Sequence, residues 1–445
     1  MADQMEYIIP PWDIETYVQN LNVSDLKNVG MKSWLDFHRR LTLLNQQSVL
    51  EITELREESV VDWFISLKKI PILVYEAIQI NIWKHKVFPL LIDLNGEPTN
   101  TFMLFSVFYH EVIVISLLEN ILFHCESAQT LDDTVIDLID YTVQRVMILL
   151  DGKTVEIYER SEIKDANSCL EEIVEKQKAF EFDIAIRCIS ILHYLIQMLD
   201  SLPLCAVSRM LVVHDIPYLF VQLIENQPWK KQDEDGYLHI GEMLTYETGW
   251  RKIKASENGK INKREGQVWF GLRELLLNPK CSPYYEITEH SLSQLSKLQR
   301  HLHEDILDQV PPLIELKRWL SYLNMSPSMP ASNSTCPIHI EVIPQIKSSI
   351  LEKYHKKWKK LAQHQSKYLF TTDASFIKDA AQILSDVYNL EKLDRIEAKK
   401  CLVCQELSKK RCSRCKDAWY CSRECQVKDW ENHKNICDTL TKTKQ

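Results

Sequence analysis

The sequence predicts an all-α protein made of a large helical body and a small metal-binding module. Glycine supplies only nine of the 445 residues, far below its usual share of about 7%. Hydrophobic residues make up 45% of the chain, and they recur at the spacing of helix faces over most of its length. Cysteine and histidine crowd the stretch from Cys401 to Gln445, which therefore differs in kind from the rest.

The first half of the chain has the pattern of packed helices. Pro10 and Pro11 suit a helix N-terminus, and Ser24 with Asp25 can cap the segment that follows. The stretch 101–123 is apolar nearly all round, which is typical of a helix buried in a large domain. We expect helices over residues 31–56, 59–69, 101–123, 126–150, 169–200, 204–213 and 217–226, with another beginning at Pro71. In the helix over 126–150 we place Asp132 and Asp133 in the first turn.

This series of helices favours a stacked solenoid of the armadillo or HEAT kind. No clean repeat period is visible, so a single irregular helical domain is the alternative.

Residues 228–262 differ from their surroundings. Six of the nine glycines fall between Gly236 and Gly271, and a short hairpin is expected around 237–240 and 244–246. Three indoles lie close by in the sequence: Trp229, Trp250 and Trp269. One interpretation is an ordered insertion pinned to the helical body by these indoles, and the other is a partner-binding loop.

Helices are expected to resume beyond this insertion, over 266–277, 288–303, 303–310 and 312–324. Residues 325–337 are rich in Ser and Pro and form the best linker or surface loop in the chain. A long basic helix over 345–367 and one more over 374–396 follow. We therefore divide the chain into a body over 1–395 and a module over 396–445.

The module carries eight potential metal ligands in the pattern C-x2-C-x7-C-x2-C-x5-C-x3-C-x7-H-x3-C. They are Cys401, Cys404, Cys412, Cys415, Cys421, Cys425, His433 and Cys437. Eight ligands make two tetrahedral sites, which is the coordination that structural Zn²⁺ requires. Cys421 and Cys425, like His433 and Cys437, stand four residues apart, so each pair is expected on one face of a helix.

The composition points to the cytosol or the nucleus. The first six residues are acidic where a secretory signal would be basic, and the most apolar stretch is interrupted by His110 and Glu111. Thiols stay reduced in those compartments, so clustered cysteines indicate metal binding. The net charge of −9 and a module that is only weakly positive once two zinc ions are bound argue against nucleic acid as a partner.

No catalytic motif is present in the sequence. Neither GxxxxGK[ST] nor GxGxxG occurs, and no GxSxG elbow is found. Two zinc ions would take all eight ligands and leave no open coordination position for hydrolysis. We therefore expect a protein without enzymatic activity, in which the metals hold the fold.

The module resembles the MYND zinc-finger family at every ligand and in the flanking residues 418–422 and 425–430. The resemblance implies an interleaved pairing that spacing alone does not fix. One zinc would bind Cys401, Cys404, Cys421 and Cys425, and the other Cys412, Cys415, His433 and Cys437. MYND fingers bind short proline-containing peptides, and the matching contact positions here are Gln426 and Trp430; a core role is the alternative for the Trp430 ring.

The body resembles that of a family of MYND-finger proteins that assist axonemal dynein assembly. The stretches that carry this resemblance are 83–89, 133–141, 208–211 and 266–269. The resemblance implies a cytoplasmic adaptor or co-chaperone for dynein arms of motile cilia, located at centriolar satellites or in the apical cytoplasm near the ciliary base. The implied partners are a leucine-rich-repeat assembly factor, an FK506-binding-type immunophilin, heat-shock chaperones and dynein chains. The alternatives are a nuclear MYND-type corepressor scaffold and, less well supported, a methyltransferase, although we find no active-site Asn-His-Ser-Cys of a SET domain.

Overall fold

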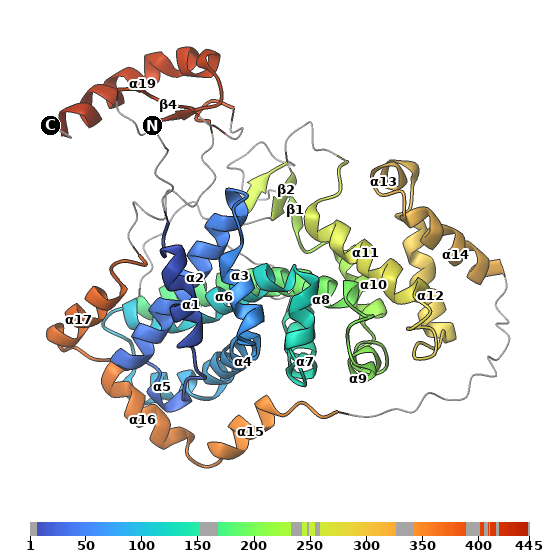
Figure 1. The fold of residues 1–445 in the computed structure, drawn as a ribbon, viewed down its shortest axis with the longest axis horizontal. Coiled ribbons are helices and arrows are strands. Elements are labelled where there is room, and N and C mark those ends of the chain that lie inside the picture. The colour runs from blue at the N-terminus through green and yellow to red at the C-terminus, as the bar shows by residue number, and fades with distance from the viewer. Residues whose placement is uncertain are drawn as a thin grey trace.

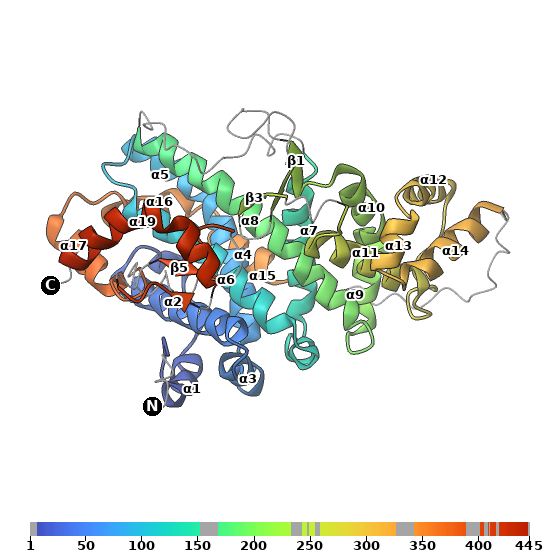
Figure 2. The same ribbon diagram turned by 90° about the horizontal axis from the view of Figure 1, so that it is seen from above.

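The computed structural model describes residues 7–151, 168–232, 243–246, 249–253, 259–325, 342–388, 401–404, 408, 410–414 and 418–443. About 70% of the chain is helical, so the predicted all-α class is confirmed. The helices form an elongated body, with α1, α2, α5, α16 and α17 towards one end and α12 to α14 at the other (Figures 1 and 2).

The first part of the body follows the predicted order of helices. Its α-helices are α1 (Pro11–Gln19), α2 (Lys32–Thr53), α3 (Ser59–Ser66), α4 (Ile70–Lys86), α5 (Phe88–Asn95), α6 (Phe102–Leu122), α7 (Thr134–Ile148), α8 (Cys169–Gln197), α9 (Leu204–Ser208) and α10 (Ile216–Asn226). Short turns separate some of them: η1 (Leu26–Asn28), η2 (Cys125–Thr130) and η3 (Arg209–Val213).

One boundary in this part was predicted wrongly. The helix expected over 126–150 begins only at Thr134, after the separate turn η2. Asp132 has a left-handed backbone with φ of 47°, which a right-handed helix cannot include. Asp133 is the residue that precedes α7 and not part of its first turn.

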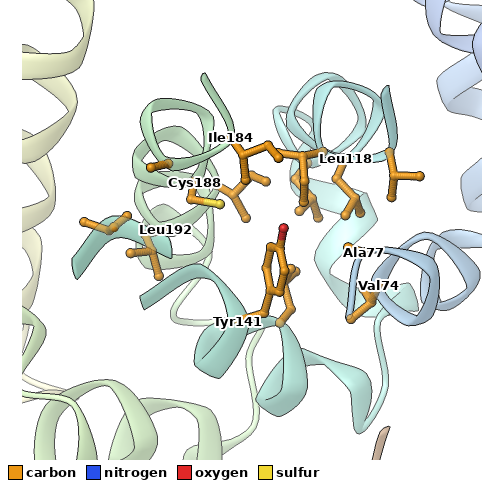
Figure 3. Packing of buried hydrophobic residues seen from close by; sticks show 14 of the residues in the cluster. Val74, Ala77, Leu118, Tyr141, Ile184, Cys188 and Leu192 are labelled. Atoms are coloured by element: carbon orange, nitrogen blue, oxygen red, sulfur yellow. The ribbon is translucent and has the colours of Figure 1, made fainter. Parts of the chain in front are cut away.

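The core is built around α6 and α8. Helix α6 packs against α2, α4 and α8, while α8 also contacts α7 and α11. Figure 3 shows Leu118 of α6 and Ile184 of α8 facing Tyr141 of α7 across one apolar cluster. Of the described helices, α6 is long and apolar enough to cross a membrane, but 83% of its apolar window is buried inside the protein. As predicted, α6 is a buried core helix.

A small three-stranded antiparallel sheet covers one side of α8. It consists of β1 (Lys230–Gln232), β2 (Met243–Tyr246) and β3 (Trp250–Lys252), in that order. The predicted hairpin is wrong in its pairing, because β2 pairs with β1 and β3, while residues 237–240 lie outside the described part of the chain. Tyr246 meets Phe182 of α8 edge-on, with ring centroids 4.8 Å apart.

The indoles near this sheet support an ordered insertion. Trp229 and Trp269 are completely buried, and the Trp250 ring stacks on Phe182 at 5.6 Å. The described part of the insertion is therefore fixed to the helical body.

The far end of the body contains α11 (Lys263–Leu277), α12 (Glu289–Lys297), η5 (Leu298–Arg300), α13 (Glu304–Gln309) and α14 (Leu313–Met325). The chain then turns back instead of extending the stack. Helix α15 (Ile346–Lys353) packs on α4 and α7, α16 (Trp358–Leu369) on α5 and η1, and α17 (Ala374–Leu384) on α2. In both views these three helices lie beside the first part of the chain (Figures 1 and 2). A simple solenoid would have placed them beyond α14.

The long basic helix predicted over 345–367 is two helices. Residues between Lys353 and Trp358 form a turn, in which Lys356 has a φ of 59°. The last body helix ends at Leu384, earlier than predicted, and the description of the body stops at residue 388. Beyond Met325, the predicted loop over 325–337 lies outside the described residues.

Hydrogen bonds fasten α16 and the segment that follows α17 to the first helices. Trp83 Nε1 donates to Gln365 Oε1 at 2.8 Å, and Gln46 Nε2 donates to the Val387 carbonyl at 2.8 Å. Arg39 Nε lies 2.9 and 3.0 Å from the two carboxylate oxygens of Asp386. A buried donor or acceptor that loses its partner destabilises the fold. Helices α16 and α17 are therefore part of the body and not an appendage.

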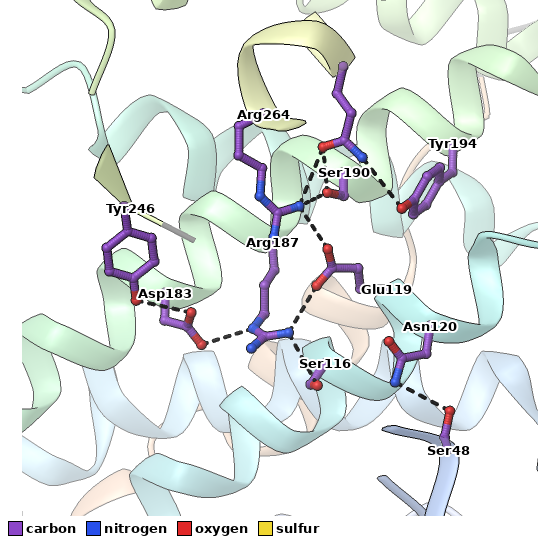
Figure 4. A network of polar contacts seen from close by, with 11 residues as sticks. Ser48, Ser116, Glu119, Asn120, Asp183, Arg187, Ser190, Tyr194, Tyr246 and Arg264 are labelled. Carbon is purple, nitrogen blue, oxygen red and sulfur yellow. Dashed lines mark hydrogen bonds and ion pairs between the residues drawn. The ribbon is translucent and has the colours of Figure 1, made fainter. Parts of the chain in front are cut away.

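A polar network joins α6, α8 and α11 (Figure 4). Arg187 contacts Glu119 and Asp183 at 2.9 Å each, and Arg264 contacts the other oxygen of Glu119 at 2.8 Å. Tyr246 donates from its hydroxyl to Asp183 at 3.1 Å, which ties the small sheet into the same network. Burial alone would lower the pKa of Arg187, but the two carboxylates outweigh that effect and raise it. The guanidinium therefore stays charged in the interior.

Replacing Gly271 with alanine should lower the free energy of unfolding of the body by about 1–3 kcal/mol, because the site is already full. A Cβ at Gly271 would lie 2.5 Å from Phe220 Cε2. Gly266 on the same helix has nothing nearer than Ile261 Cγ2 at 3.8 Å, so Gly266→Ala should be neutral or stabilise by up to about 1 kcal/mol. Urea denaturation of both variants measures the difference. Equal effects would contradict the packing of α11 on α10.

Candidate metal centre and docking surface

In its described residues, the C-terminal module has a two-stranded sheet and one helix. Strand β4 (Lys410–Arg411) pairs antiparallel with β5 (Trp419–Tyr420), and α19 (Arg423–Thr443) follows. Ser422 precedes the helix, and its hydroxyl accepts from the Cys425 amide at 3.3 Å, as serine does at a helix start. The helix thereby carries Cys425, His433 and Cys437 towards the strands.

The first ligand cluster joins two cysteines from the start of the module with two from the end of β5 and the first turn of α19. The Sγ atoms of Cys401, Cys404, Cys421 and Cys425 all lie within 4.8 Å of one another. Cys404 Sγ is 3.2 Å from Cys421 Sγ and 3.9 Å from Cys425 Sγ, and the latter two are 3.6 Å apart. Sulfurs at Zn–S distances of 2.3 Å form a tetrahedron with edges of about 3.8 Å. The cluster therefore fits a tetrahedral zinc ion.

The second cluster contains Cys412, His433 and Cys437, whose ligand atoms also lie within 4.8 Å of one another. Cys412 Sγ and Cys437 Sγ are 3.9 Å apart, again close to a tetrahedral edge. All three side chains are buried. Cys415, the predicted fourth ligand, lies outside the described residues. The module is thus able to hold two zinc ions, in the interleaved arrangement that the MYND resemblance implies.

The protonation of the first cluster also favours a metal. Burial would raise the pKa of the Cys401 thiol, but backbone hydrogen bonds at Cys404, Cys421 and Val403 lower it to about 6. The thiolate is the form that binds metal. Hydrogen bonds with the sulfurs of Cys404 and Cys425 favour the protonated thiol of Cys421 and raise its pKa to about 12. A bound divalent cation would favour the thiolate at this position instead.

The helix geometry differs from the prediction for one ligand pair. Helix α19 begins at Arg423, so Cys421 lies in the turn before the helix and not on its face. Cys421 directly follows β5, and the turn brings it back towards Cys425. His433 and Cys437 do share one face of α19, as four-residue spacing predicts.

The two predicted peptide contacts lie in different surroundings. Gln426 lines an open pocket of about 420 Å³ together with Lys410, Ser413, Ser422 and Arg423. Trp430 does not line this pocket; its side chain is 37% exposed, and its ring meets His433 edge-on at 6.1 Å. Trp430 thus covers a metal ligand with one edge and leaves the remainder accessible.

Sequence reasoning missed two features of this surface. Tyr420, which is buried, donates from its hydroxyl to Asp429 of α19 at 2.8 Å and so joins strand and helix. Lys410 and Arg423 place basic groups around the Gln426 pocket. The start of α19 was also missed, although Ser422 is a residue type that commonly precedes a helix and was the available signal in the sequence.

Comparison with known proteins supports these observations. A family model described as MYND finger matches residues 401–437. A curated relative, the zinc finger MYND domain-containing protein 10 homolog of Drosophila melanogaster, is 33% identical over 458 aligned residues, covering 97% of this chain and 99% of the relative. This chain belongs to the zinc finger MYND domain-containing protein 10 family. No solved structure matches it.

Membership in the zinc finger MYND domain-containing protein 10 family extends over the helical body as well as the finger, because the match spans nearly the whole chain. The MYND finger is a protein-interaction domain. Protein binding is therefore the function that the finger of this family shares with other MYND proteins.

Proposed function

We propose that this protein is a non-enzymatic adaptor, or co-chaperone, for the cytoplasmic preassembly of axonemal dynein arms. The observation that carries the proposal is the combination of family membership over 97% of the chain with a finger whose described metal ligands form a four-cysteine cluster and a cluster of Cys412, His433 and Cys437. With Cys415 as the proposed fourth ligand of the second cluster, both zinc sites would be closed, and closed sites of this kind stabilise a binding module.

The finger would dock partner proteins through the Gln426 pocket and the exposed part of Trp430. Lys410 and Arg423 add positive charge at the pocket, and an amphipathic indole is a frequent anchor in protein interfaces. The proposed partners are a leucine-rich-repeat assembly factor, an FK506-binding-type immunophilin, heat-shock chaperones and dynein chains.

Affinity purification from ciliating cells tests the docking role. The variant Gln426→Ala/Trp430→Ala should retain two zinc ions but recover at least about ten-fold less partner protein, as expected for interface anchors. Lys434→Ala is the matched control, because Lys434 is an exposed residue of the same helix outside the pocket. If the double variant recovers as much partner as the control, the finger surface is not the docking site. If the double variant loses zinc instead, Trp430 is a core residue, and the proposal that its exposed part docks partner proteins fails.

Loss of the protein tests the role in dynein assembly. Cells that lack it should form cilia that do not beat and that lack dynein arms, whereas normal arms would contradict the proposal. We place the protein in the cytoplasm, at centriolar satellites or near the ciliary base. Chromatin association without a cytoplasmic pool would favour the nuclear corepressor alternative.

A further inference from the structure

A pocket on the helical body, away from the finger, has the properties of an anion site. It has a volume of about 340 Å³ and lies between α4, α7 and α15. Its lining residues are Asn81, Ile82, His85, Lys86, Gln144, Arg145, Lys347 and Leu351. Three of them are permanent cations, and none is an aspartate or glutamate.

Arg145 is the unusual member of this set. Its side chain is only 7% exposed, and within the described part of the chain neither Nε nor Nη1 has a hydrogen-bond partner. Its guanidinium lies over the Tyr141 ring, 5.9 Å from the centroid. A buried charged group without hydrogen bonds destabilises the folded state. We therefore expect a hydrogen-bond acceptor for this arginine.

Glu111, the buried carboxylate on which Arg145 acts electrostatically, is already engaged by other groups. Glu111 contacts Lys84 Nζ at 2.6 Å and accepts from the Tyr141 hydroxyl at 2.6 Å. Arg145 acts on Glu111 electrostatically, without a hydrogen bond between them. An acceptor for Arg145 would therefore have to come from outside the chain. Since Nε and Nη1 are closed to solvent, a ligand in the pocket would meet the part of the guanidinium that remains accessible there.

We propose that this pocket binds a small soluble anion that carries one or more phosphoryl groups. Guanidinium matches phosphoryl oxygens bidentately, and lysines add charge without geometric demands. The side-chain amide of Gln144 can donate to a further oxygen, and that of Asn81 keeps one N–H beside the bond that it already donates to Glu111 Oε1 at 3.3 Å. Ile82 and Leu351 form an apolar wall, which would suit the carbon framework of an organic phosphate. The volume is that of a small-molecule site and is far larger than a halide ion needs.

Such a ligand would bridge α15 to the rest of the body. Lys347 belongs to α15, Arg145 to α7 and Lys86 to α4. The start of α15 is already held by Asp137 of α7, whose carboxylate accepts from the Gln345 and Ile346 amides at 3.2 and 3.0 Å. The bound anion would add a second attachment, so hydrogen exchange of the α15 amides should slow on binding.

Calorimetric titration of the full chain with inorganic pyrophosphate and with inositol hexakisphosphate tests the proposal, with sulfate at equal ionic strength as the comparison. Lys86→Gln/Lys347→Gln should weaken binding at least about ten-fold, since each lysine supplies a charged hydrogen bond. Lys359→Gln/Lys360→Gln removes the same charge from exposed positions of α16 outside the pocket and should leave the affinity unchanged.

A further variant tests the role of the guanidinium. Arg145→Gln should abolish the rise in melting temperature that pyrophosphate produces. Because Arg145 also supports the buried Glu111 carboxylate electrostatically, the melting temperature of this variant without ligand should fall, and the rise is measured from that new baseline. A pyrophosphate-induced rise that persists in Arg145→Gln, or equal loss of binding in both lysine pairs, would overturn the assignment. So would the absence of binding, an equal response to sulfate, or binding only to phosphatidylinositol phosphate vesicles and not to either soluble anion.

Discussion

Replacing Cys404 with serine should unfold the finger and leave the chain with at most one zinc ion. The only apolar cluster described in the finger consists of Cys401, Cys412, Ala418, Tyr420 and Cys437, with a few partly buried neighbours. Such a cluster is too small to fold alone. Structural zinc supplies about 10 kcal/mol or more of folding free energy in small fingers, so losing one ligand removes most of the stability.

Mass spectrometric zinc analysis and limited proteolysis of the full chain measure this effect. Protease should cut within α19 in the variant. The melting temperature of the helical body should stay within about 2 °C of the wild type, since the finger has an apolar cluster separate from that of the body. Cys125→Ser is the matched control, because Cys125 is an exposed cysteine outside the finger. A Cys404→Ser chain that keeps two zinc ions and a protected α19 would show that Cys404 is not a ligand.

Replacing Lys84 with methionine should lower the free energy of unfolding of the body by about 3–5 kcal/mol. The Lys84 ammonium and the Glu111 carboxylate are 2.6 Å apart, and their side chains are 2% and 0% exposed. Removing the cation leaves an uncompensated charge in the core. Lys176→Met breaks an ion pair with Glu172 in which both groups are exposed by a third or more, so it should change stability by less than about 1 kcal/mol.

The pH dependence provides a second test of the Lys84 pair. Burial raises the pKa of Glu111, but Lys84, Arg145 and Tyr141 outweigh it and hold the pKa below its ordinary value of 4.5. A depressed pKa in the folded state stabilises at neutral pH, and that contribution is lost as the pH falls through the folded pKa. Without Lys84, the Glu111 pKa should rise above its unfolded value. As the pH falls, the stability gap between variant and wild type should therefore narrow, first through the raised Glu111 pKa of the variant and then through the depressed Glu111 pKa of the wild type. A gap independent of pH would contradict this assignment.

Most of the body helices could be predicted because their apolar positions repeat at the helical period. Helix α6 was recognisable from a stretch that is apolar on all sides, and proline marked the starts of α1 and α4. The errors lie where local geometry overrides that pattern. Lys356 and Asp132 have left-handed backbones, which neither composition nor periodicity reveals for residues other than glycine.

The return of α15 to α17 could not be predicted for a different reason. Their attachment rests on pairs such as Trp83 with Gln365, which are 282 residues apart in the sequence. A single sequence carries no record of such contacts. The metal clusters were accessible because fixed spacing between ligand residues is itself the signal, whereas the body pocket was not, since Arg145 and Lys347 become neighbours only through that return.

The return of the chain also dictates the order in which this protein can be completed during synthesis. The Trp83 indole cannot make its buried bond until Gln365 has been translated, 282 residues later, and His38 must wait for Tyr388, 350 residues later. At about 5–20 residues per second, surfaces of α2 and α4 stay uncovered for roughly 15 seconds to one minute on the ribosome. We therefore expect the nascent chain to expose apolar surface to holding factors during this interval, and a stop codon before α17 to leave the surfaces that α17 covers exposed.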